Sequence, residues 1–175
     1  PEQLLKRLAE NEHILLEVHA LLTKTLKDNS RIAPAGEWLL DNFYLIEENI
    51  YTGKKHLPKG YSKTLPQLLK GESAGMPRVY DLAVEIISHS DGHVDINSLT
   101  DFINSYQTIN YLKLGELWAI PIMLRLALIE NLRRLSIQIA EEINYKSLAA
   151  RWADEMIEVA DKNPRNLVIV IADMA

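Results

Sequence analysis

The sequence contains no cysteine, which excludes a disulfide framework and any chemistry that depends on a thiolate. It also lacks an excess of positive charge, because the formal net charge is −5 over 175 residues. A protein that binds nucleic acid needs a basic face, so nucleic acid is not an expected partner. The hydrophobic fraction of 47% and the charged fraction of 25% are those of a globular protein, and the length predicts one domain over 1–175.

Recognisable catalytic motifs are also missing. Gly71 and Gly75 are isolated and follow no predicted strand, so no phosphate-binding loop is present. Possible triad residues are scattered, and no pair of glycosidase carboxylates can be chosen among 24 acidic residues. The best cluster by composition is His89, Asp91, His93 and Asp95, but Gly92 indicates a turn and a closed ligand set is lacking. We therefore assign no catalytic residue and no metal site.

The most distinctive stretch is 114–135, LGELWAIPIMLRLALIENLRRL, which is apolar on nearly every side of a helix. Such a helix is either buried or in a membrane. A membrane span needs about 20 apolar residues, and the uncharged run between Glu116 and Arg125 is too short. The stretch therefore predicts a long buried central helix, kinked at Pro121, and no transmembrane helix is expected.

Other segments carry apolar residues at helical spacing. Helices are predicted over 2–27, from Pro34 to Gly53, from Pro77, after an N-cap at Asp95, and from Asn144. The run 167–174 contains β-branched residues that favour a strand, but no other strand could pair with it, so we interpret it as helix. The predicted fold is all-α, a multi-helix bundle of about six to seven helices around the long kinked central helix.

Several charged and aromatic residues on and around the central helix are candidate binding residues: Asp41, Glu48, Arg78, Tyr80, Glu116, Trp118, Arg125, Glu130 and Arg134. A buried guanidinium is costly unless it is paired, so Arg125 is expected to pair with a carboxylate of the neighbouring helices, among Asp41, Glu47, Glu48, Asp81 and Glu85. Glu130 and Arg134 have the spacing of a pair within one helix, and Glu116 lies in a first turn, where the helix dipole favours a carboxylate. Two interpretations stay open: a buried network that fixes helix register, or a pocket that binds a sugar or another domain.

Stretches in the first three quarters of the chain resemble the N-terminal region of cyclic β-1,2-glucan synthases, which are large bacterial inner-membrane glycosyltransferases. They occur in family order as ENEHIL (10–15), EWLLDNFYLIEENI (37–50), LPKGYSKTLPQL (57–68), GMPRVYDLAVEI (75–86) and the stretch 114–135. The last two are the most specific, and the resemblance is weak beyond Glu141. One departure is Lys113, which stands where a capping box would place Ser or Thr, three residues before Glu116.

The resemblance implies a multidomain membrane enzyme whose transferase part uses UDP-glucose and a divalent cation to build and cyclise a β-1,2-glucan. A chain that starts at Pro1 and stops at Ala175 is expected to be a piece of such a polypeptide, lying on the cytoplasmic side of the inner membrane. No cofactor is expected in this piece. A transferase of this type needs Asp-x-Asp-like and Gln-x-x-Arg-Trp motifs; the first is absent, and Arg151-Trp152 has Leu148 in place of the Gln.

These observations favour a non-catalytic helical segment that docks on, positions or regulates the transferase and membrane parts of the same polypeptide. The alternative is a module that binds a saccharide or nucleotide sugar and handles the growing glucan, with Arg78, Tyr80, Glu116, Trp118 and Arg125 in or near one groove. A third hypothesis is a free-standing helical hydrolase or transferase, so whether the chain alone is an enzyme stays open.

Overall fold

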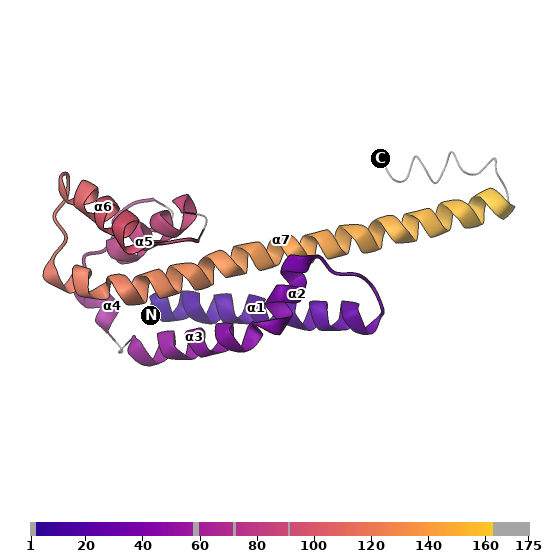
Figure 1. Cartoon of the computed structure of the whole chain (residues 1–175), viewed down its shortest axis with the longest axis horizontal. Coiled ribbons are helices and arrows are strands. Elements are labelled where there is room, and N and C mark those ends of the chain that lie inside the picture. Colours follow the sequence, from indigo (N-terminus) through magenta and orange to yellow (C-terminus); the bar gives the residue numbers. More distant parts are fainter. Residues whose placement is uncertain (1–2, 58–59, 72, 91, 163–175) are drawn as a thin grey trace. The chain divides into compact units, whose positions relative to one another are not determined.

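The computed structural model describes residues 3–57, 60–71, 73–90 and 92–162. Within these residues the chain forms seven helices and no strand, with one isolated β-bridge between Gln67 and Pro77 (Figure 1). The predicted all-α class and number of helices are confirmed. The chain divides into two compact units, Pro1–Ile137 and Gln138–Ala175, and the single domain over 1–175 stays a prediction.

The helices follow one another in this order: α1 (Gln3–Lys27), α2 (Pro34–Asp41), α3 (Phe43–His56), α4 (Tyr61–Thr64), α5 (Arg78–His89), α6 (Ile96–Gln107) and α7 (Leu114–Lys162). The predicted N-cap of α6 is confirmed, because the Asp95 carboxylate accepts from the backbone N–H groups of Asn97 and Ser98 at 2.9 Å each. The run 167–174 lies outside the described residues.

The helix predicted from Pro34 to Gly53 is in fact two helices, α2 and α3, that meet at Asn42. The Asn42 side-chain amide donates to the Trp38 carbonyl oxygen at 2.8 Å, and the backbone at Asn42 leaves the helical conformation (φ −109°, ψ 11°). Asparagine side chains compete with the backbone for such hydrogen bonds, which is why this residue can end one helix and start the next. Apolar periodicity alone did not reveal the break.

The prediction that Gly53 ends its helix is wrong, because this residue lies buried inside α3. A Cβ atom at this position would lie 3.4 Å from a methyl group of Leu126 on α7 and 3.4 Å from a methyl group of Leu8 on α1. Glycine therefore allows three helices of the first unit to approach one another closely at this point.

We expect Gly53→Leu to destabilise the first unit by roughly 1–3 kcal/mol, because the added atoms must displace Leu8 and Leu126 from a packed core. Gly53→Ala is the matched control. It should be close to neutral, since the advantage of alanine as a helix former, about 1 kcal/mol, offsets the cost of the tight contacts that its methyl group makes with Leu8 and Leu126. Urea unfolding of both variants measures the difference, and a Gly53→Leu variant as stable as the wild type would refute the close packing.

Helix α7 extends far beyond the predicted central helix, which was expected to end near Leu135 and to be followed by a new helix at Asn144. The correction has a simple cause: residues 136–144 contain neither glycine nor proline, so nothing interrupts the helix. Pro121 lies inside α7, which continues through it. A kink at this residue stays a prediction.

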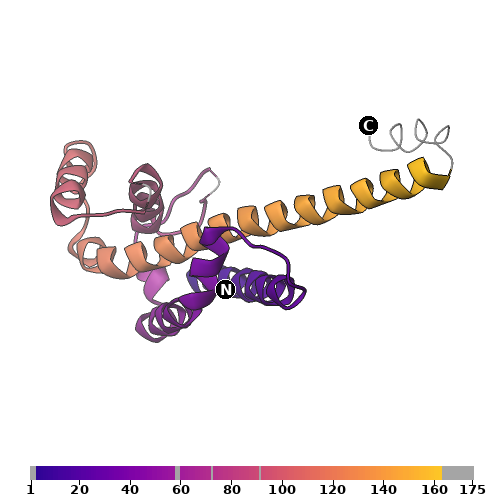
Figure 2. The same ribbon diagram turned by 45° about the vertical axis from the view of Figure 1, so that its right-hand side comes forward.

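The core of the first unit lies along the segment 114–137 of α7. Helices α1 and α3 pack on one side of this segment, and α5 and α6 pack on another (Figures 1 and 2). The first side buries apolar residues that include Leu4, Leu8, Leu15, Ile46, Ile50, Met123 and Leu126. The second is a cluster of Leu82, Ile86, Ile103 and Leu112. The segment 114–137 is therefore central, as its composition predicted.

Candidate functional site

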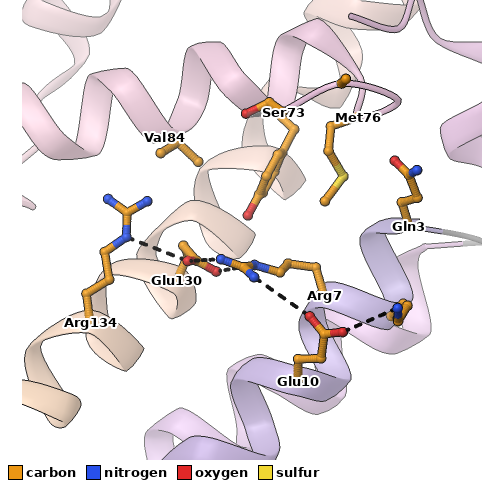
Figure 3. Close-up of a pocket in the computed structure, with 11 residues that line it drawn as sticks. Gln3, Arg7, Glu10, Ser73, Met76, Val84, Glu130 and Arg134 are labelled. Atoms are coloured by element: carbon orange, nitrogen blue, oxygen red, sulfur yellow. Dashed lines mark hydrogen bonds and ion pairs between the residues drawn. The ribbon is translucent and has the colours of Figure 1, made fainter. Parts of the chain in front are cut away.

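A buried carboxylate on α7, that of Glu130, is surrounded by arginines (Figure 3). Arg7 of α1 binds it with two hydrogen bonds, from Nε to Oε2 at 2.9 Å and from Nη2 to Oε1 at 2.7 Å. Arg133 Nη2 donates to Oε1 at 2.7 Å, and Arg134 Nε forms an ion pair with it at 3.6 Å. Arg7 reaches Glu130 because it extends from the face of α1 that buries Leu4 and Leu8. Three guanidinium groups therefore meet one carboxylate.

The electrostatics of this cluster follow from burial and from these contacts. Burial alone would raise the pKa of Glu130, but hydrogen bonds from Arg7, Arg133 and Asn11 outweigh it and lower the pKa to about 2. Burial and the negative charge of Glu130 raise the pKa of Tyr80 to about 12. At neutral pH, Glu130 is therefore ionised and Tyr80 is a neutral hydroxyl group.

A pocket of about 340 Å³ opens beside this cluster, and we call it the arginine pocket. Its walls come from α1, the segment 73–76, α5 and α7 (Figure 3). The lining residues are Gln3, Lys6, Arg7, Glu10, Ser73, Ala74, Met76, Tyr80, Val84, Glu130 and Arg134. Predicted site residues Tyr80, Glu130 and Arg134 are thus brought together, but in a different group from the one expected.

A second buried ion pair holds the start of α7. The Glu116 carboxylate, fully buried, accepts from Arg78 Nε at 2.7 Å, from Arg78 Nη2 at 2.8 Å and from the Lys113 backbone N–H at 2.9 Å. Arg78 Nη2 also donates to the Tyr111 carbonyl oxygen at 2.6 Å. Burial opposes ionisation of Glu116, but the Arg78 and Lys113 hydrogen bonds prevail and hold its pKa below the usual range.

This arrangement explains the departure at Lys113. Half of a capping box survives, because Glu116 still reaches back to the backbone N–H of the residue that precedes the helix. The Arg78 guanidinium supplies the rest of the fixation from α5. The sequence predicted only an interaction of Glu116 with the helix dipole, whereas the structure shows that Glu116 also binds Arg78 and the Lys113 backbone N–H.

The paired network expected around Arg125 is not found. Arg125 is half-buried, and it forms no ion pair with any of the described residues, including Asp41 and Glu48, which are exposed. Trp118 is 78% exposed. The stretch 114–135 is apolar on several sides, so the sequence did not reveal which face of this helix would lie toward α2 and α3. Arg78 and Glu116 lie together, but Tyr80 and Arg125 belong to other sites, so the predicted single groove is not formed.

Arg125 instead lines a second hollow of about 640 Å³, which we call the apolar groove. Its walls come from α2, α3, Gly92 and α7, all within the first unit, and the lining residues include Trp38, Leu45, Ile46, Pro121, Leu124, Leu128, Leu132 and Leu135. Of these, Trp38, Leu45, Leu128 and Leu135 are large side chains with substantial exposure. Large exposed apolar patches are typical of interaction surfaces.

Sequence reasoning missed the residues of α1 and α7 that line the arginine pocket or contact Glu130 beside it: Lys6, Arg7, Glu10, Asn11 and Arg133. Arg7 and Glu130 are 123 positions apart, so no local spacing links them. One residue could have revealed this site from the sequence. Asn11 is a polar residue on the apolar face of α1, and a buried polar side chain indicates a buried polar partner.

No group of three or more His, Asp or Glu residues that could hold a metal ion occurs in the described part of the chain, while Asp91 of the predicted cluster lies outside it. None of the described helices is long and apolar enough to cross a membrane.

The first unit is therefore a set of helices that encloses two buried ion-pair clusters, and the sequence of the chain is similar to a segment of a cyclic glucan synthase. The relative is the cyclic beta-(1,2)-glucan synthase NdvB of Rhizobium meliloti (strain 1021), with 34% identity over 161 residues, or 92% of the chain. The chain spans only 6% of the length of that relative. No family model matches the chain. The predicted resemblance is confirmed, and it covers more of the chain than the stretches that suggested it.

Proposed function

We propose that the chain is a non-catalytic helical segment of a cyclic β-1,2-glucan synthase that docks on the transferase part of the same polypeptide. The observation that supports this most is the similarity over 92% of the chain to a stretch that makes up 6% of a synthase. A segment so small within so long a protein has many surfaces of the same polypeptide to contact. The synthase would use UDP-glucose and a divalent cation elsewhere, and this segment would lie on the cytoplasmic side of the inner membrane.

The hydrogen bonds of the two buried carboxylates support a structural role for them. Glu116 is saturated by Arg78 and Lys113, and Glu130 is held by Arg7 and Arg133. Carboxylates whose pKa values lie below the usual range do not accept protons near neutral pH, so neither is suited to general acid catalysis.

The docking surface that we propose is the apolar groove. Most of its exposed residues are apolar or aromatic, with Asn49 as a polar exception, and the half-buried Arg125 has no ion-pair partner among the described residues. Buried aromatic anchors and arginine are the residues that contribute most to protein interfaces. The occupant that we propose is the transferase part, because the length of the relative leaves most of such a polypeptide outside this chain.

In a longer synthase polypeptide that contains this segment, we expect Leu128→Glu to reduce glucan synthesis strongly, because a carboxylate in the groove would have to be desolvated on docking. Leu69→Glu is the matched control, since Leu69 is 91% exposed and does not line the groove. Thermal unfolding of the isolated variants separates docking from folding. Equal synthesis by the two variants would contradict the proposed surface.

A saccharide-binding module is the second candidate, favoured by one observation. Trp118 and Tyr111 are both highly exposed, and exposed aromatic rings offer a sugar a surface for stacking. An NMR titration with short β-1,2-linked glucans tests this, with saturable shifts of the Trp118 indole as the expected result. Unchanged spectra would remove this candidate.

A further inference from the structure

The arginine pocket holds more positive charge than its own carboxylates balance. Of the lining residues, Lys6, Arg7 and Arg134 are cationic, whereas Glu10 and Glu130 are the acidic partners in their ion pairs. The carboxylate of Glu130 is already satisfied by Arg7 and Arg133 at 2.7–2.9 Å. One positive charge therefore remains in excess among the described residues that line this concave surface, which favours binding of an anion.

The excess charge is available to a ligand. Of the three arginines around Glu130, Arg134 is held most weakly, because its single ion pair within the described residues is 3.6 Å long and its side chain is 52% exposed. Lys6 is 71% exposed, and its ammonium group lies 3.6 Å from Glu10. Both distances exceed those of charge-assisted hydrogen bonds, which are about 2.7–2.9 Å. These two cations can therefore bind an anion while the Arg7–Glu130 pair stays intact.

We propose that the arginine pocket binds the phosphate group of a phosphate-bearing ligand, with Arg134, Lys6 and the Nη1 of Arg7 as the cationic contacts. Guanidinium groups match phosphate oxygens with parallel hydrogen bonds, and an ammonium group adds a point charge. The volume of about 340 Å³ lies at the lower end of the range for small-ligand sites.

The remaining walls suit a ligand that is larger than inorganic phosphate. Gln3 and Tyr80 present neutral polar groups, and the Tyr80 hydroxyl keeps its proton at neutral pH. Met76 and Val84 form an apolar wall on the opposite side from α1, where an organic group attached to the phosphate can pack (Figure 3). The pocket shares no lining residue with the apolar groove, so this proposal does not depend on the docking role.

Glu10 gives the proposal a distinctive signature. Its carboxylate lies 3.7 Å from Arg7 Nη1 and 3.6 Å from Lys6, so it partly occupies the position proposed for the anion. A bound phosphate has to displace it, and Glu10 is partly exposed and can turn into solvent. Substitutions of two residues in one pocket should therefore change affinity in opposite directions: Arg134→Gln weakens binding and Glu10→Gln strengthens it.

The test is an NMR titration of the chain with inorganic phosphate, pyrophosphate and a nucleoside diphosphate, following the Nε–Hε signals of the arginines. A parallel arm measures co-sedimentation with vesicles that contain a phosphomonoester lipid. Arg134→Gln should weaken binding about tenfold, the value of one charge-assisted hydrogen bond. Arg125→Gln is the matched control, since it removes an arginine from the same helix outside the pocket.

Saturable shifts of Arg7 and Arg134, weaker in Arg134→Gln and tighter in Glu10→Gln, support the site. Binding by soluble phosphates assigns it to a small molecule, and binding by vesicles alone assigns it to a lipid headgroup. Absence of binding to every probe overturns the proposal. Equal weakening by Arg125→Gln and Arg134→Gln also overturns it, because the binding would then follow the overall charge of the chain.

Discussion

Replacing Arg78 with alanine is expected to lower the free energy of unfolding by about 3–5 kcal/mol, the usual cost of removing one partner from a buried ion pair. The reason is Glu116, which is fully buried and would keep a single hydrogen bond, from the Lys113 backbone N–H. The substitution also removes the hydrogen bond to the Tyr111 carbonyl oxygen, which ties the segment before α7 to α5. Urea unfolding at neutral pH measures the loss.

Lys113→Ala is the matched control for this prediction. It removes an exposed cation close to Glu116 but keeps the backbone N–H, so a change within about 0.5 kcal/mol is expected. The double variant Arg78→Met with Glu116→Leu should recover much of the loss, because replacing both partners leaves no unpaired charge. A cost below about 1 kcal/mol for Arg78→Ala would contradict the buried pair, given this usual range.

Replacing Glu130 with glutamine is expected to cost about 3 kcal/mol at neutral pH, because a pKa lowered from 4.5 to about 2 corresponds to roughly this energy. The pKa is lower in the folded state than in the unfolded chain, so this stabilisation is complete above pH 4.5 or so and is lost as the pH falls toward 2. Glu116 contributes with the same sign, since its pKa is also lowered.

Urea unfolding of the wild type and of Glu130→Gln between pH 2 and pH 7 tests this. The wild type should lose stability steeply on acidification, and the variant should show a shallower dependence with the two curves converging near pH 2. Parallel curves over the whole range would mean that the arginines do not stabilise the ionised form of Glu130.

The sequence predicted the helices well because their apolar periodicity is a local property. It identified the first helix, the N-cap at Asp95 and the central position of 114–135, and each is found in the structure. Its errors lie where a single residue decides between two local outcomes. Asn42 breaks a helix with a side-chain hydrogen bond, and Asn144, predicted as a cap, lies inside α7.

The candidate site was less predictable because its partners come from distant parts of the chain. The pair of Glu130 and Arg134 was foreseen from its spacing of four residues and is present at 3.6 Å. The stronger pair with Arg7 depends on how α1 packs against α7, which no sequence pattern reveals. Arg125 was expected to be the buried cation of the central helix, whereas the buried carboxylates pair with Arg78, Arg7 and Arg133.

Cysteine labelling tests whether the apolar groove docks on the rest of a synthase polypeptide. The chain has no cysteine, so a single introduced thiol is unique within it. A maleimide should modify Leu135→Cys in the isolated chain but much more slowly in the longer polypeptide, while Leu69→Cys, outside the groove, reacts in both. Mass spectrometry of the peptides assigns the modified position. Equal labelling of Leu135→Cys in the isolated chain and in the longer polypeptide would contradict the docking role.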